Sequence, residues 1–218
     1  MRIERAIVRT LAIVDKALRS EFADDFDKRC LYTAFAVFAL LQDAGFDTRL
    51  AGGDFVAFVV ARSGERAGLQ GFGYGSDQPS HFWVEVQDTI VDLGPHYLPH
   101  GSSFAAAAMP LVAWQLSDGL PVYLRYRTHM RYDPAVQLQS FPNVIARKDR
   151  FVAGCRAKYA AQRGQPRLPS WLLTGPVALE RAAREGDVWA TNALRFAAGI
   201  DRSQLPFEFQ RGSGQAMA

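Results

Sequence analysis

Three residues of this sequence, Cys30, His81 and Asp92, are of the types that together carry out nucleophilic catalysis. A thiolate is a strong nucleophile, and an imidazole can accept a proton from the thiol and later deliver one to a leaving group. A carboxylate can orient that imidazole and stabilise its cation. We therefore predict a catalytic Cys-His-Asp triad, which requires a fold that brings the three side chains together.

Cys30 stands near the start of a segment that we expect to form a buried helix. Asp27 is a good N-cap, Gly45 is a good residue just beyond the C-terminus, and the intervening residues are apolar on nearly every face as far as Gln42. This start would make Cys30 the third helical residue, where unpaired amides and the helix dipole favour a thiolate. A buried structural cysteine is the alternative.

His81 opens one expected strand and Asp92 lies on the next. If a two-residue turn at 87–88 joins the strands, Val86 pairs with Thr89, and the histidine and aspartate become diagonal neighbours on one face. A turn shifted by one residue would place them directly opposite each other, and a three-residue loop would place them on opposite faces. A strand-end histidine and a turn aspartate without catalytic roles are the alternatives.

The remaining pattern predicts an α+β fold, with a central buried helix packed on an antiparallel sheet and extra C-terminal helices. Residues 2–20 have the period of an amphipathic helix, and residues 45–64 favour a strand with an irregularity at Gly52-Gly53. Residues 65–80 are glycine-rich, and we expect a loop there. Further strands are expected at 112–116 and 121–130, a helix from Asn143 to about Gln162, and one or two helices over 176–199, split near Gly186-Asp187.

The chain has 218 residues, which suffices for one compact domain. We expect residues 1–140 to form the α+β core and residues 141–218 a helical extension packed on it. The shares of hydrophobic (49%) and charged (22%) residues are those of a soluble globular protein. The net charge of +3 gives little reason to expect nucleic acid or an anionic membrane as partner, although residues 124–132 mix Arg with Tyr as some nucleic-acid-binding segments do.

The cysteine content and the N-terminus bear on the compartment. The two cysteines, Cys30 and Cys155, are too few for a disulfide framework, which favours a reducing compartment, although the sequence leaves their pairing open. Charged residues interrupt the apolar runs of the N-terminal segment, which argues against a signal peptide, and no apolar stretch reaches the length of a membrane span. We expect a cytoplasmic protein.

The order of these motifs resembles the transglutaminase-like branch of the papain-type cysteine enzymes, which is similar in outline to arylamine N-acetyltransferases and to peptidoglycan or peptide amidases. In that superfamily a cysteine begins a helix, a glycine turn precedes an Arg-bearing strand (here Gly45 and Arg49), a histidine precedes an aromatic-Val-Glu strand, and an aspartate ends the next strand. The resemblance covers about residues 27–95. It points to a small bacterial family that supplies chemistry but no substrate.

The sequence departs from papain-type enzymes in two respects, and both leave room for an inactive relative. The hairpin between His81 and Asp92 is tighter than expected for the superfamily, and a usual oxyanion donor is missing. These enzymes often carry a glutamine or another donor upstream of the cysteine to bind the oxyanion, and residues 1–29 contain no Asn, Gln, His, Tyr or Trp. The donors would then be backbone amides near Cys30 or groups from elsewhere in the chain.

From the residues and the resemblance we predict a cysteine-dependent hydrolase or acyltransferase that acts on an amide, peptide or acyl substrate through a thioester intermediate. Hydrolysis is favoured because water needs no second binding site. The alternative is a non-catalytic binding module that retains the fold. We expect a small-molecule or peptide substrate and neither nucleic acid nor membrane as partner, and a homodimer is left open.

Two further expectations concern the site. No organic cofactor and no metal are expected. His96 and His100 are four residues apart, but Pro95 and Pro99 argue against a shared helix and there is no further cysteine or histidine cluster, so a zinc site is not expected. The side chains expected to line the substrate pocket are Tyr32, Trp83, His96 and Tyr97.

Overall fold

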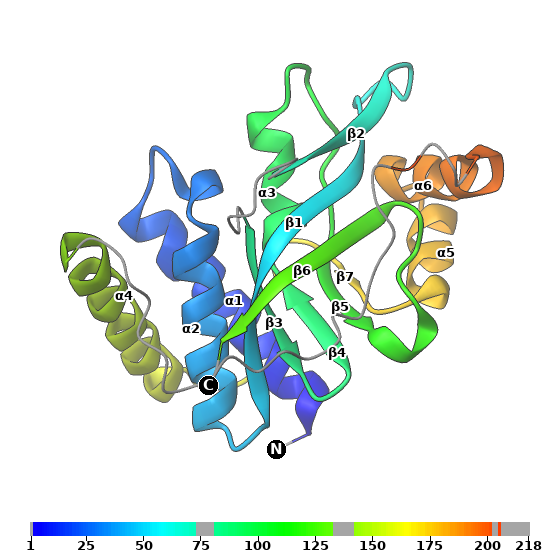
Figure 1. Ribbon diagram of the computed structural model, residues 1–218. Coiled ribbons are helices and arrows are strands. Elements are labelled where there is room, and N and C mark those ends of the chain that lie inside the picture. The colour runs from blue at the N-terminus through cyan, green and yellow to red at the C-terminus, as the bar shows by residue number, and fades with distance from the viewer. Residues whose placement is uncertain (1, 73–80, 133–141, 202–204, 206–218) are drawn as a thin grey trace.

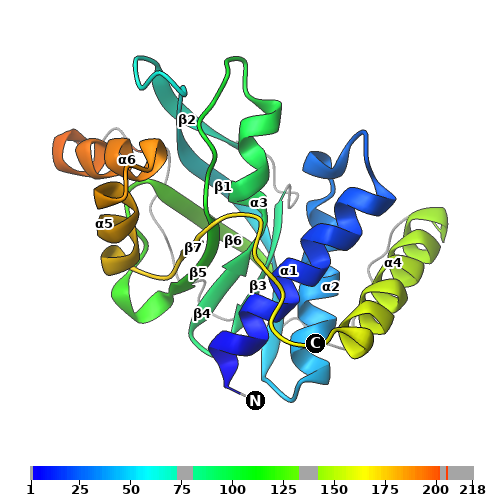
Figure 2. The ribbon, with the colours of Figure 1, turned by 180° about the vertical axis from the view of Figure 1, so that it is seen from behind.

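The computed structural model describes residues 2–72, 81–132, 142–201 and 205. Within these residues it is a mixed α/β fold of six helices and a curled mixed sheet (Figures 1 and 2). The helices are α1 (Ile3–Glu21), α2 (Cys30–Asp43), α3 (Gly94–Tyr97), α4 (Pro142–Ala161), α5 (Pro176–Arg184) and α6 (Val188–Gly199), with short 3-10 turns η1 (Phe26–Lys28), η2 (Leu98–Gly101) and η3 (Leu116–Asp118). The strands are β1 (Thr48–Val60), β2 (Ala67–Phe72), β3 (His81–Val86), β4 (Thr89–Asp92), β5 (Leu111–Gln115), β6 (Leu124–Tyr132) and β7 (Leu172–Leu173).

The sheet has the strand order β2-β1-β3-β4-β5-β7. Strand β6 lies outside this order and also pairs with β1. Every pair is antiparallel except β5 and β7, which are parallel. The expectation of a purely antiparallel sheet is therefore wrong at this one pair. A long connection that includes α4 precedes β7, and a connection of that length allows the strand to pair in either direction.

The long strand β1 carries the irregularity expected at Gly52-Gly53, where its register with β6 shifts by one residue. The loop expected over 65–80 is wrong in part, because residues 67–72 form β2 against the second half of β1. The extended edge of β1 supplies hydrogen-bonding partners there, which outweigh the low strand propensity of the glycines. Residues 73–80 lie outside the described part of the chain.

Helix α2 ends as expected but starts later. Gly45 has φ +88°, its amide donates to the carbonyl of Gln42, and the amide of Phe46 donates to that of Leu41, which is a Schellman ending. At the other end, Asp27 lies within η1 and is not the N-cap, so Cys30 is the first helical residue and not the third.

The later start of α2 follows from local contacts that precede it. The amides of Lys28 and Arg29 donate to the carbonyls of Asp25 and Phe26, which tightens the chain into a 3-10 turn. An ion pair between the Arg29 and Asp25 side chains closes the same turn. These bonds override the capping preference of Asp27.

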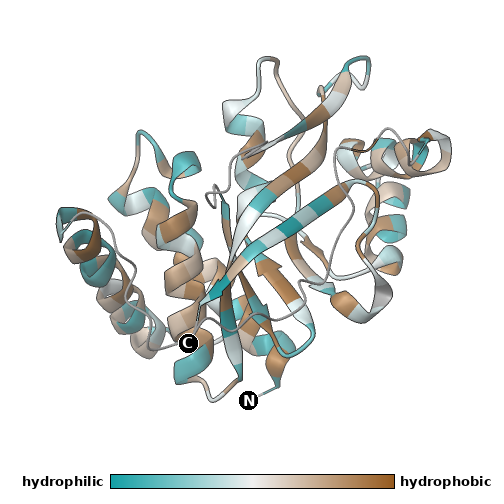
Figure 3. Ribbon diagram, viewed as in Figure 1, coloured by the Kyte–Doolittle hydropathy of each residue, from teal (hydrophilic) through white to brown (hydrophobic). Residues whose placement is uncertain are grey.

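The helices form two groups on the sheet. Helices α1, α2 and α4 pack on one another on one side, and α5 and α6 lie together at the other, with α6 against β1 (Figures 1 and 2). Hydrophobic residues concentrate in α2 and the inner strands, whereas β6 carries several hydrophilic residues (Figure 3). The C-terminal third thus packs on the core at two places and adds β7 to the sheet. Of the helices described, none is both long and apolar enough to cross a membrane.

Candidate active site

The β3–β4 hairpin has the register that the sequence predicts from a two-residue turn. Val86 pairs with Thr89, and the turn residue Gln87 adopts φ 53°. His81 and Asp92 therefore lie on the same face of the hairpin, and the His81 Nε2 and Asp92 Oδ2 atoms are 2.8 Å apart. This part of the predicted geometry is confirmed.

Asp92 is buried, and both of its oxygens are occupied. Besides His81, Oδ2 accepts a hydrogen bond from the Tyr126 hydroxyl at 2.9 Å, and Oδ1 accepts one from the Gly94 amide at 2.7 Å. Burial and the Asp92 charge both raise the pKa of Tyr126, so its hydroxyl stays protonated and donates. Two neutral donors thus hold the carboxylate in the position where it meets the imidazole.

Position 94 must be a glycine because the His81 ring and the Asp92 carboxylate lie close to its Cα atom. A Cβ atom at this position would lie 2.3 Å from the His81 Cε1 atom and 2.7 Å from its Nε2 atom. Real carbon atoms do not approach so closely, so any larger residue at Gly94 would displace the imidazole or the backbone after Asp92.

The His81 ring is fully buried and is surrounded by aromatic side chains. The ring centroids of Phe55 and Trp83 lie 5.0 and 6.0 Å from that of His81. Nε2 of His81 faces Asp92, and the Cys30 side chain interacts with the same imidazole closely enough to raise its pKa. One ring thus interacts with both Cys30 and Asp92.

The charge balance around His81 favours the protonated imidazole. Burial opposes the positive charge, but the Asp92 charge and its hydrogen bond, reinforced by Cys30, outweigh it and raise the pKa of His81 to about 10. A protonated ring has two N–H donors, one for each partner.

The two cysteines have different environments. Cys30 is half-buried and is the first residue of α2. The first hydrogen bond of this helix runs from the Thr33 amide to the Arg29 carbonyl. Amides in this first turn have no helical acceptors and favour negative charge. Cys155 lies fully buried within α4, and burial raises the pKa of its thiol to about 12. Neither cysteine forms a disulfide.

Of the four expected pocket residues, the structure brings Trp83 to the triad. Its ring stacks beside that of His81, and its buried Nε1–H has no acceptor within the described residues. Tyr32 is buried against Phe22 and Phe151. Contact of these side chains with a substrate stays a prediction.

His96 and Tyr97 make interior contacts beside α1. The Tyr97 hydroxyl donates to Asp15, and the two ring nitrogens of His96 face the carbonyl of Met109 and the Arg19 guanidinium. Contact of His96 and Tyr97 with a substrate likewise stays a prediction.

Sequence reasoning missed Phe55, Gly94 and Tyr126 as parts of the site. Gly94 had a signal, because it follows the aspartate by two residues and precedes a proline. Tyr126 and Phe55 had none, since their closeness depends on the pairing of β6 with β1, where they are direct partners.

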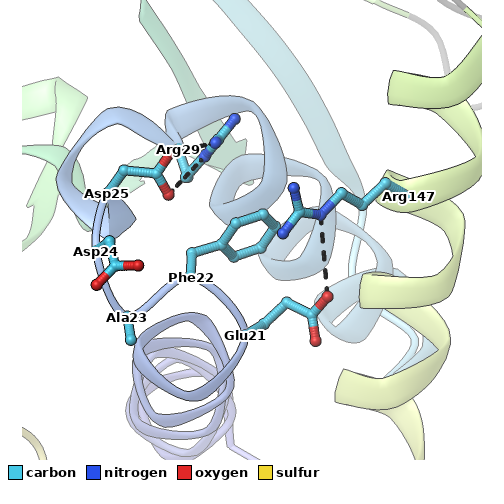
Figure 4. A pocket seen from close by; sticks show the side chains of 7 residues that line it. All are labelled: Glu21, Phe22, Ala23, Asp24, Asp25, Arg29 and Arg147. Atoms are coloured by element: carbon cyan, nitrogen blue, oxygen red, sulfur yellow. Dashed lines mark hydrogen bonds and ion pairs between the residues drawn. The ribbon is translucent and has the colours of Figure 1, made fainter.

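An open pocket of about 230 Å³ lies where α1, α2 and α4 meet, near the start of α2 (Figure 4). Arg29 and Arg147 both lie over the Phe22 ring and pair with the carboxylates of Asp25 and Glu21. These charges compensate each other, and none of the described residues lining the pocket belongs to the triad. The lining residues are Glu21, Phe22, Ala23, Asp24, Asp25, Arg29 and Arg147.

Comparison of the chain with protein-family models, with curated proteins and with solved structures finds no match. The function is therefore inferred from the geometry of Cys30, His81 and Asp92.

Proposed function

We propose that this chain is a cysteine-dependent hydrolase or acyltransferase that acts on an amide, peptide or acyl substrate through a thioester intermediate. The observation that carries the proposal is the buried imidazole of His81, whose Nε2 lies 2.8 Å from Asp92 Oδ2 and which also interacts with the Cys30 side chain. The start of α2 at the cysteine and the resemblance to the papain and transglutaminase-like core also support it.

The proposed reaction has two halves. The Cys30 sulfur attacks the substrate carbonyl carbon, a tetrahedral oxyanion forms, and the proton on His81 Nδ1 passes to the leaving amine or alcohol as its bond to carbon breaks. An acyl group then remains on the sulfur as a thioester. In the second half, water or an acceptor gives a proton to His81 and attacks the thioester carbon, and the carbon–sulfur bond breaks to release the product and restore the Cys30 thiolate beside protonated His81.

The residues divide these tasks by position. The first-turn amides of α2 lie near the nucleophile and supply donors for the oxyanion. Asp92 keeps the imidazole in one orientation and stabilises its positive charge, while Tyr126 and Gly94 keep the carboxylate itself in place.

The test is labelling by an electrophilic acyl probe that forms a thioester, read by intact-protein mass spectrometry. We expect Cys30→Ala to abolish labelling and Cys155→Ala to retain it, because Cys30 contacts His81 whereas Cys155 lies buried in α4. Asp92→Asn is expected to weaken labelling without abolishing it. Equal labelling of the wild type and Cys30→Ala would rule out the proposed enzyme and leave a binding module.

A further inference from the structure

One guanidinium group links two turns that flank the triad. Arg19 lies in the last turn of α1. Its Nε donates to Asp15 Oδ1 at 2.8 Å, and its Nη2 lies 3.2 Å from His96 Nε2. Its Cζ lies 4.5 Å from the ring centroid of Phe26 and 5.5 Å from that of Tyr97. Arg19 therefore contacts η1 and α3 at the same time.

On one side, Arg19 contacts the turn that precedes the nucleophile. Phe26 begins η1, and its carbonyl accepts the amide of Arg29, the residue just before Cys30. The Phe26 ring also packs edge-on against His100 of η2, with centroids 4.8 Å apart. Because three residues in a tight turn separate Phe26 from Cys30, a shift of the Phe26 ring passes directly into the start of α2.

On the other side, Arg19 contacts the helix that follows the carboxylate. Helix α3 begins at Gly94, whose amide donates to Asp92. His96 Nδ1 lies 2.8 Å from the carbonyl oxygen of Met109. Since a carbonyl only accepts, Nδ1 carries the proton and Nε2 presents a lone pair to the Arg19 guanidinium. The His96 Nδ1–H thus donates to the Met109 carbonyl, and the Arg19 guanidinium donates to His96 Nε2.

We propose that Arg19 is a positioning residue that holds the Cys30 turn and the Asp92 turn at a fixed separation, so that His81 meets both partners at once. The proposal rests on the proposed function. Arg19 acts through the aromatic and imidazole rings that it contacts. Lysine is no substitute, because it has neither the planar face that stacks on the rings nor a rigid fork with two separate donors.

The same helix supplies a matched control. Arg9 of α1 donates to the carbonyls of Tyr159 and Gln162 at 2.7 and 3.0 Å, and its Cζ lies 4.4 Å from the Tyr159 ring centroid. Arg9→Met therefore removes a stacked guanidinium with two hydrogen bonds, as Arg19→Met does. The Arg9 change affects the packing of α1 on the end of α4 and leaves the turns beside the triad as they are.

Two readouts in the 218-residue chain test the proposal. One is the rate of Cys30 alkylation by iodoacetamide, followed on its own peptide by mass spectrometry. The other is the downfield N–H proton resonance of the His81 ring, identified by its absence in His81→Ala. Both are measured below the melting temperature of the least stable variant.

We expect Arg19→Met and Arg19→Lys each to slow alkylation by about tenfold or more, since displacements near 1 Å have effects of this size or larger in such sites. The His81 resonance should broaden or disappear in both, while Arg9→Met should keep the wild-type rate and resonance. Arg19 variants that behave like wild type, or an Arg9→Met variant that is slowed as much, would overturn the proposal.

Failure of the proposed function would be distinguishable. In that case wild-type Cys30 would alkylate no faster than the same cysteine in the chain unfolded in urea. The His81 resonance would still report whether Arg19 holds the histidine against its carboxylate.

Discussion

Two histidine–carboxylate pairs among the described residues have the same length but lie in different surroundings. His81 Nε2 lies 2.8 Å from Asp92 Oδ2, and His129 Nε2 lies 2.8 Å from Asp54 Oδ2. The His81 side chain is completely buried, whereas that of His129 is 24% exposed on β6. The distance alone therefore does not distinguish a candidate catalytic pair from an ordinary one.

The two carboxylates differ in what else they bind. Asp92 accepts from two neutral donors, the Tyr126 hydroxyl and the Gly94 amide. Asp54 Oδ2 accepts a hydrogen bond from the Arg127 guanidinium and also faces His129. A carboxylate paired with arginine has its charge already compensated, so it has less to offer an imidazolium.

The histidines also differ in their second partners. The His81 imidazole also interacts with the Cys30 side chain, which raises its pKa. The chain has one other cysteine, Cys155, and it lies buried in α4 rather than beside the β6 histidine. The His81 pair thus differs from the His129 pair in three respects: its histidine is completely buried, its carboxylate accepts from neutral donors, and Cys30 interacts with its imidazole.

The largest expected effect comes from removing each histidine in turn. We expect His81→Ala to slow alkylation of Cys30 at pH 7 by about thirtyfold, because the thiolate is the nucleophile and a thiol with the ordinary pKa of about 8.5 is only about 3% thiolate at that pH. His129→Ala removes the same ring from the other pair and should change the rate by less than about twofold. Peptide-level mass spectrometry measures both rates, and similar losses in the two variants would contradict the distinction drawn between the pairs.

The short-range parts of the site were predictable from the sequence. Strand alternation and a two-residue turn fix which residues of a hairpin share a face, so the pairing of His81 with Asp92 followed from local spacing. The end of α2 at Gly45 was also predictable, because it depends on the residue type at that one position. The start of α2 was not, because a 3-10 turn closed by Arg29 and Asp25 overrides the capping preference of Asp27.

The supporting residues could not be predicted, because they come from distant parts of the chain. Tyr126 lies 34 positions beyond Asp92 and reaches it only because β6 pairs with β1. Arg19 and His96 are 77 positions apart. Amphipathic periodicity predicts that one face of α1 is buried, but it does not predict which turn the last residues of α1 contact.

A second prediction concerns the pH dependence of stability contributed by the buried pair. The pKa of His81 in the folded chain, about 10, lies above its ordinary value of 6.5, so proton binding favours the folded state. This contribution is complete below about pH 6.5 and is lost as the pH rises through about 10, with a slope of at most about 1.4 kcal/mol per pH unit.

The measurement compares the free energy of unfolding of wild type and His81→Gln from pH 6 to pH 10 by urea denaturation. The comparison cancels other titrating groups, such as the Cys155 thiol, whose pKa burial raises to about 12. The stability advantage of the wild type should shrink steadily with rising pH. A constant difference across this range would show that Asp92 does not hold an imidazolium in the folded chain.

The smallest expected effect sharpens the comparison of the two carboxylates. Tyr126→Phe removes one neutral donor from Asp92 Oδ2 and leaves the other oxygen bonded to Gly94. A hydrogen bond to a charged group contributes about 1.5 kcal/mol or somewhat more, so we expect a loss of stability of about that size. If the same free energy is lost in the transition state, the labelling rate falls by about tenfold.

Tyr123→Phe is the matched control, because Tyr123 is also buried but packs against Trp114 and Trp189 and not against Asp92. It should leave the labelling rate unchanged. If Tyr126→Phe lowers stability without changing the rate, the hydroxyl stabilises the fold but does not position the carboxylate. Asp92 would then be held for catalysis by the Gly94 amide alone, and the difference between the two pairs would lie in burial and in the nucleophile beside His81.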